Sequence, residues 1–131
     1  MRKNVTITVK SAEAHYRVRG VMEYGEAETR LVYEEPAALG LGGVTTELAL
    51  CGGRAVLKRS GEVRSELRFE VGAPHASVYE TKHGSFPAEL VTHAVRARLS
   101  PRGGPVELHY TLTLGGAADE HRLRLWIRTE E

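Results

Sequence analysis

Histidine offers the most versatile chemistry in this chain, because its imidazole ring binds metal ions and transfers protons near neutral pH. Of the six histidines, His75, His83 and His93 are 8 and 10 residues apart, and His109 and His121 are 12 apart. None of these spacings matches a zinc-binding motif. We therefore expect neither a metal site nor a cofactor.

The residue types needed for nucleophilic catalysis are scarce. Asp119 is the only aspartate, which leaves little material for a Ser-His-Asp triad, and no Gly-x-Ser-x-Gly motif occurs. The single cysteine, Cys51, has no His or Asp near it in the sequence, so we interpret it as a small, half-buried apolar residue. With no catalytic motif found, we favour a protein that is not an enzyme.

Arg59 is the side chain whose position matters most for function. It shares strand parity with Leu57, so an inward-facing strand would carry its guanidinium into the interior. An unpaired charge there would cost several kcal/mol, and a partner is required. That partner is Glu34 or Glu35 in a structural pair, or else the carboxylate or phosphate of a ligand, since the arginine fork matches both. A solvent-facing Arg59 is the third possibility.

Three further residues complete the candidate ligand site of Arg59 and Glu35. Tyr33 and Tyr79 are amphipathic and could line the mouth of a cavity, although such tyrosines more often pack with a bonded hydroxyl. His93 shares strand parity with Val91 and Val95 and is expected to point inward. There we expect a hydrogen-bonded core histidine rather than a ligand-binding one.

Alternating apolar and polar residues predict the elements that position these side chains. Odd-numbered positions 63–71 are mostly apolar and even-numbered positions 62–70 are charged, as in an antiparallel strand with one wet face. The dipeptides Gly52-Gly53 and Ser60-Gly61 suit two-residue hairpins, and Gly20 suggests a bulge or sharp bend. Strands are predicted around residues 5–10, 14–24, 27–35, 44–51, 54–59, 62–71, 75–82, 106–114 and 122–128.

Residues 85–99 fit two structures. Pro87 would start a helix with Leu90/Ala94 and Val91/Val95 as its apolar stripe, whereas a strand would place Val91 and Val95 on one face. Propensity alone favours the helix. In either case, this many antiparallel strands must close or stack to protect their edges. We expect one all-β domain over residues 1–131, an up-and-down antiparallel barrel of about 8–10 strands, with a sandwich as the alternative.

The middle of the chain carries a more specific pattern. It consists of Tyr33-Glu34-Glu35, Arg59-Ser60-Gly61, Arg68-Phe69 with Gly72, and then Tyr79, Gly84 and Thr92. In these residues the chain resembles the YwiB-like family, small bacterial proteins of unknown function, over nearly its whole length. The resemblance implies a calycin-type, lipocalin-like barrel and a strand rather than a helix at 85–99. It implies no activity, and the 36–43 loop is more apolar here than the family pattern.

Composition limits the partners. The 18 basic and 17 acidic residues give a net charge of +1, so no overall field steers the protein to nucleic acid, although Trp126 lies among Arg122, Arg124 and Arg128. We therefore expect no nucleic-acid partner. No apolar run approaches the ~20 residues of a membrane span, and one cysteine allows no internal disulfide. With no apolar signal core near the start, these features favour the cytoplasm and no membrane association.

Two functions remain. The leading hypothesis is a non-enzymatic barrel that binds a small amphipathic or anionic ligand in its interior. The alternative is a solid barrel that acts through its outside as a homodimer or protein-interaction module. Trp126 on a polar face and the Leu39/Leu41 loop motivate this alternative, because exposed apolar residues mark contacts.

Overall fold

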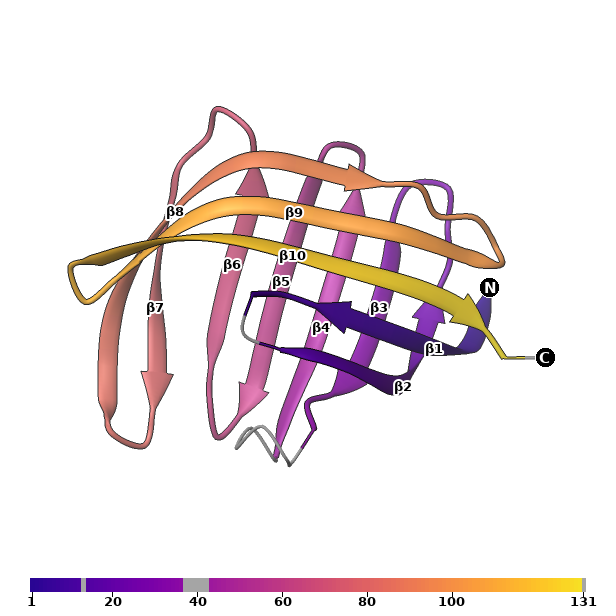
Figure 1. Ribbon diagram of the computed structural model, residues 1–131, viewed down its shortest axis with the longest axis horizontal. Coiled ribbons are helices and arrows are strands. Elements are labelled where there is room, and N and C mark those ends of the chain that lie inside the picture. The colour runs from indigo at the N-terminus through magenta and orange to yellow at the C-terminus, as the bar shows by residue number, and fades with distance from the viewer. Residues whose placement is uncertain (13, 37–42, 131) are drawn as a thin grey trace.

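Antiparallel strands make up the computed structural model of the protein, which describes residues 1–12, 14–36 and 43–130 (Figure 1). The described residues form ten strands. They are β1 (Arg2–Lys10), β2 (His15–Glu23), β3 (Thr29–Glu34), β4 (Val44–Cys51), β5 (Arg54–Gly61), β6 (Ser65–Glu70), β7 (His75–Thr81), β8 (Gly84–Ala97), β9 (Gly103–Leu114) and β10 (Ala117–Thr129).

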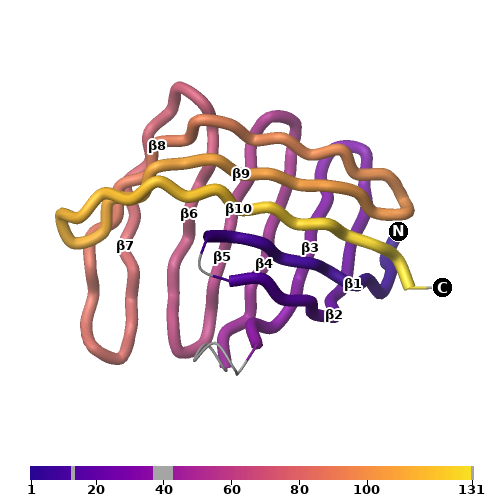
Figure 2. The backbone as a smooth tube through the Cα atoms, viewed as in Figure 1, coloured from indigo at the N-terminus to yellow at the C-terminus, as the bar shows by residue number. Residues whose placement is uncertain are grey.

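The strands follow one another around a nearly closed barrel. Hydrogen-bonded neighbours run in the order β6-β5-β4-β3-β2-β1-β10-β9-β8-β7. Consecutive strands are therefore neighbours except for β6 and β7, which stand at the two ends of the sheet, and β1 pairs with β10. In Figure 2, β8–β10, β1 and β2 cross in front of β3–β7 at a steep angle. The predicted all-β, up-and-down barrel is confirmed, with the upper number of strands.

The barrel closes between β6 and β7 through sparse contacts. Arg64 and Glu80 exchange two backbone hydrogen bonds of 2.9 Å. The Ser77 hydroxyl also donates to the Glu66 carbonyl at 2.7 Å. Because this seam lacks a continuous ladder, side-chain packing across it must supply much of the closure.

Residues 85–99 are a strand to Ala97, as the family resemblance implied, and the helix favoured by propensity is wrong. β8 pairs with β7 over 84–90 and with β9 over 88–97, and Ala88, Leu90 and Thr92 are buried in alternation. Hydrogen-bonded neighbours on both sides satisfy the backbone in the extended form and outweigh a weak helical preference.

The observed turns agree only in part with those predicted from the sequence. Cys51 pairs with Arg54, so Gly52-Gly53 forms the predicted two-residue hairpin. The hairpin predicted at Ser60-Gly61 is wrong, because both residues extend β5 and pair with β4. The pairing of Arg59 with Ser65 moves the connection to residues 60–64.

Gly20 causes no bulge. It pairs with Val5 and Tyr33 without a register shift. A Cβ there would lie 2.5 Å from the Val32 carbonyl oxygen, so the glycine permits β2 and β3 to approach closely.

Inward-facing aliphatic side chains fill much of the barrel. Ile7, Leu31, Leu48 and Leu108 are each 0% exposed, and Phe69 is 1% exposed. The predicted inward parity of Ser65, Leu67 and Phe69 is confirmed, whereas Val71 lies beyond the end of β6 and is exposed. No helix long and apolar enough to span a membrane occurs in the described part of the chain.

Candidate functional site

Arg59 lies on the inner face of β5 and its side chain is 26% exposed. Its Nε is 3.6 Å from Glu35 Oε1, within ion-pair range but beyond a good hydrogen bond, and its Nη1 donates to the Tyr79 hydroxyl at 2.8 Å. Burial lowers the pKa of Arg59, but Tyr79 and Glu35 raise it by more, and the net shift is upward. The structure therefore forms the pair with Glu35, one of the partners expected from the sequence.

Glu35 is the buried anion of the site, with a side chain only 1% exposed. It follows the last residue of β3, where its backbone N–H donates to the Val44 carbonyl at 2.9 Å. Tyr16 donates its hydroxyl to Oε2 at 2.7 Å, and Thr46 donates to Oε1 at 2.6 Å. Two hydroxyl donors and one arginine compensate the desolvation of this carboxylate.

Two tyrosines adjoin this pair on the interior side. Tyr33 is 4% exposed, and its burial, with the Glu35 charge, raises its pKa above the usual value. The pKa of Tyr16 is raised first by burial, then by Tyr33 and by the hydrogen bond to Glu35. Tyr16 is the site residue that sequence reasoning missed, although the alternation along 14–24 already placed it on the face of Val18.

Tyr16 predicts a loss of stability at alkaline pH. Its folded-state pKa is raised above the unfolded value of about 10, so the unfolded chain loses the phenolic proton first. The contribution of Tyr16 to the free energy of unfolding is therefore complete below about pH 10, and it falls as the pH rises toward the folded-state pKa. Urea unfolding from pH 8 to 11 should show a decline in the free energy of unfolding that is shallower in Tyr16→Phe. Equal declines in both proteins would contradict this assignment.

A cavity of about 330 Å³ opens beside Arg59 at the mouth of the barrel. Its polar lining comes from Arg59, Tyr79 and His121, and His121 stacks on Tyr110 at a centroid distance of 5.2 Å. Ser11, Asp119 and Arg122 complete the polar lining. The remaining wall is largely aliphatic, with Leu57, Leu67, Leu112, Leu114 and Leu123. Such a mixture of an apolar wall and a few convergent polar groups is typical of small-molecule sites.

His93 does not join this site, and the prediction that it points inward is wrong. Leu90 and Thr92 are buried, so Val91 and His93 lie on the exposed outer face of β8. The register shift between Thr92 and Ala94 turns Val95 toward the core, which is why Val95 does not share the face of His93. Its Nε2 lies 2.8 Å from Thr111 Oγ1, and its ring centroid is 5.0 Å from that of His109. Among the residues that the structure describes, no group of three or more His, Cys, Asp or Glu could hold a metal ion.

Of the other residues that the sequence singled out, four belong to the site at Arg59 and the rest do not. Arg59, Glu35, Tyr33 and Tyr79 converge around one buried charge pair, and Arg59 and Tyr79 line the cavity. Trp126 lies on the outer face of β10 and is 53% exposed. Leu39 and Leu41, proposed with Trp126 as a contact surface, fall outside the described residues.

Comparisons with known proteins agree with this architecture. The model of a family described as a domain of unknown function, DUF1934, matches residues 2–125. No curated protein matches the chain. The crystal structure of the ywiB protein from Bacillus subtilis is similar, with a TM-score of 0.84 at 22% identity over 99% of this chain and 94% of that one. At this identity the likeness shows the fold alone.

Proposed function

The chain belongs to the DUF1934 family, a domain of unknown function, and we propose that the mouth of its barrel binds a small amphipathic molecule with a carboxylate or phosphate head group. The observation that carries this proposal is Arg59 beside the cavity. Its Nε is buried with no hydrogen-bond acceptor among the described residues, and its fork is held in place by Tyr79.

The hydrogen bonding of Glu35 leaves donors of Arg59 for a ligand. Both carboxylate oxygens of Glu35 already accept short bonds from Tyr16 and Thr46, while the Arg59 contact is long. Glu35 thus balances the charge of Arg59 but does not occupy all the N–H donors of the Arg59 guanidinium. A partly exposed guanidinium with spare donors is suited to a carboxylate or phosphate.

The aliphatic wall suits the other end of such a molecule. Burying one CH₂ group of a chain against leucines contributes about 0.8 kcal/mol. A cavity of about 330 Å³ is at the small end of the range for ligand sites. We therefore expect a short acyl or alkyl chain rather than a large lipid.

Thermal unfolding in the presence of hexanoate, octanoate and octyl phosphate tests the proposal. A ligand at about 100 times its Kd stabilises the folded state by about 2.7 kcal/mol, which raises the Tm of the wild-type protein by several degrees. Leu114→Trp fills part of the cavity and is expected to abolish the shift. Val91→Trp, on the exposed outer face of β8, is the matched control and should retain it. No shift in the wild type, or an equal shift in Leu114→Trp, would overturn the proposal.

A further inference from the structure

The outer face of β2, β1, β10, β9 and β8 concentrates positive charge around the chain's only tryptophan. We name the basic face by its residues, which are Lys10, Arg17, Arg96, Arg98, Arg124 and Arg128 around Trp126. We propose that this face binds a single-stranded polynucleotide, with a base stacked on Trp126 and phosphates on the surrounding cations. The proposal does not depend on the cavity at the barrel mouth.

Strand register places these side chains in adjacent rows. Thr8 pairs with both Arg17 and Trp126, and Trp126 pairs in turn with Pro105. Lys10 pairs with Arg124, the next outward residue of β10. Five strands at about 4.8 Å spacing make a surface roughly 19 Å across, enough for a few nucleotides.

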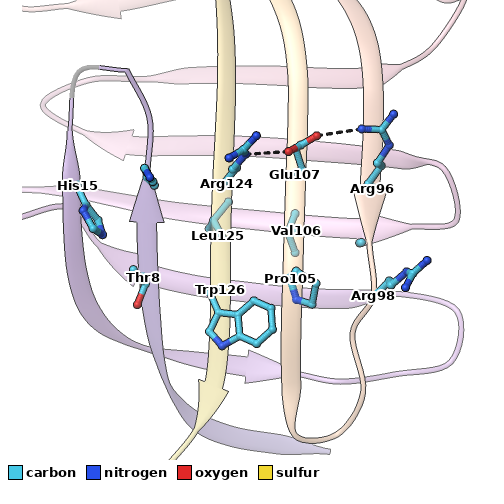
Figure 3. Close-up of a pocket in the computed structure, with 12 residues that line it drawn as sticks. Thr8, His15, Arg96, Arg98, Pro105, Val106, Glu107, Arg124, Leu125 and Trp126 are labelled. Carbon is cyan, nitrogen blue, oxygen red and sulfur yellow. Dashed lines mark hydrogen bonds and ion pairs between the residues drawn. The ribbon is translucent and has the colours of Figure 1, made fainter.

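Trp126 lies in a shallow groove of about 590 Å³. In Figure 3 its indole ring is seen face-on from outside, beside Pro105. At 53% exposure, one face of the ring is open to a partner. Stacking of a base on an exposed aromatic ring is the usual way in which proteins bind single strands without sequence preference.

The charges near Trp126 are largely uncompensated. Glu107 is the one carboxylate in the described lining of the groove, and it accepts from Arg96 at 3.1 Å and from Arg124 at 2.9 Å (Figure 3). This bridge fixes two guanidinium groups in place. The other four cations of the basic face form no ion pair with any described residue; they are Lys10, Arg17, Arg98 and Arg128.

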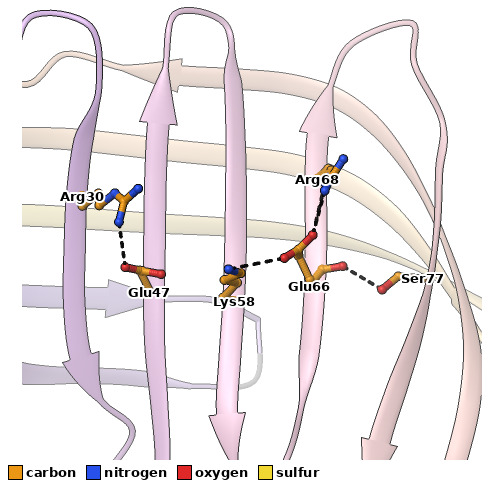
Figure 4. A network of polar contacts seen from close by, with 6 residues as sticks. All are labelled: Arg30, Glu47, Lys58, Glu66, Arg68 and Ser77. Atoms are coloured by element: carbon orange, nitrogen blue, oxygen red, sulfur yellow. Dashed lines mark hydrogen bonds and ion pairs between the residues drawn. The ribbon is translucent and has the colours of Figure 1, made fainter.

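On the other side of the barrel, the charged side chains are paired with one another. On the outer face of β3–β6, Arg30 pairs with Glu47, and Lys58 and Arg68 both pair with Glu66 (Figure 4). The net charge of +1 therefore conceals two differently charged sides, and the argument against nucleic acid from net charge does not apply to the basic face.

Charge also selects among the possible occupants of this face. A two-fold contact between copies would place the same cations against one another, which opposes a homodimer here. An anionic membrane would satisfy the charge, but Val106 and Leu125 of the groove lining are buried. The exposed apolar residues left there are Ala97, Pro105 and the flat indole, with no long aliphatic side chain to insert. A polyanion that carries flat bases fits both the charge and the ring.

Binding is tested with fluorescein-labelled 12-mers of oligo(U) and oligo(dT), measured by anisotropy between 50 and 300 mM salt. We expect affinity to fall with salt, with a log–log slope of about −0.7 for each phosphate contacted. Trp126→Ala should weaken binding about tenfold, and Trp126→Phe should restore part of the loss. Arg98→Gln with Arg128→Gln should reduce the slope, whereas Arg68→Gln on the balanced face should not.

Intrinsic fluorescence supplies an independent measurement, because Trp126 is the chain's only tryptophan. Base stacking should quench it when an unlabelled oligonucleotide binds, while polyphosphate, which has no bases, should leave it nearly unchanged. Quenching by either RNA or DNA supports the proposal. No binding at 50 mM salt, an unchanged affinity in Trp126→Ala, or binding to phosphatidylglycerol vesicles alone would overturn it.

Discussion

Replacing Arg59 with methionine is expected to lower the free energy of unfolding by about 3–5 kcal/mol, the usual cost of removing one partner of a buried ion pair. Glu35 is 1% exposed and would lose its only cationic partner among the described residues. Tyr79 would also lose the donor that holds its hydroxyl. Equilibrium urea unfolding, with fitted slopes compared between proteins, measures this change.

A second substitution separates charge from packing. In Arg59→Met with Glu35→Gln, the amide oxygen still accepts a hydroxyl bond from Thr46 or Tyr16, but no buried charge remains. The double variant should be more stable than Arg59→Met alone. If the two variants are equally unstable, the cost arises from lost packing and the buried pair is not what holds this end of the barrel.

Replacing Phe69 with alanine is expected to cost about 3–5 kcal/mol, as for other large aromatic residues removed from cores. Phe69 is 1% exposed on β6, beside the seam with β7, and meets Tyr110 of β9 edge-on at a centroid distance of 5.0 Å. Because few hydrogen bonds join β6 and β7, the stability of this seam depends more than usual on the contact between Phe69 and Tyr110.

Val71→Ala is the matched control for this prediction. Val71 lies just beyond β6 and is 59% exposed, so its truncation should change stability by less than about 0.5 kcal/mol. Urea unfolding of both variants decides the matter. A loss below about 1 kcal/mol in Phe69→Ala would show that the seam does not depend on this ring.

Much of the fold could be predicted because period-two alternation is a local signal. Each strand buries one face, so the pattern in β1, β6 or β9 appears in the sequence almost as it does in the barrel. Residues 85–99 are different, because their choice between helix and strand depends on pairing with β7 and β9. The family resemblance supplied that information, and propensity did not.

The candidate site shows where parity reasoning stops. The sequence left the inward position of Arg59 conditional, and the structure places it inside. The bulge between Thr92 and Ala94 separates outward-facing Val91 and His93 from inward-facing Val95, so the parity that they share does not mean a shared face. Tyr16 escaped notice because its contact with Glu35 joins segments that are 19 residues apart and follow no motif. The charge of the basic face is visible in the sequence only around Trp126, because its other cations lie on β1, β2 and at the end of β8 and average out in the total charge.

The central claim is that Arg59 binds the head group of a ligand at the barrel mouth. Isothermal titration of octyl phosphate into the wild type and into Arg59→Met with Glu35→Gln tests it most directly, because the pair of substitutions removes the guanidinium without leaving a buried charge. We predict binding to the wild type that is weakened about tenfold or more in the variant, the value of a charge-assisted hydrogen bond. Equal affinity in a folded variant, or no heat of binding to the wild type, would contradict the account.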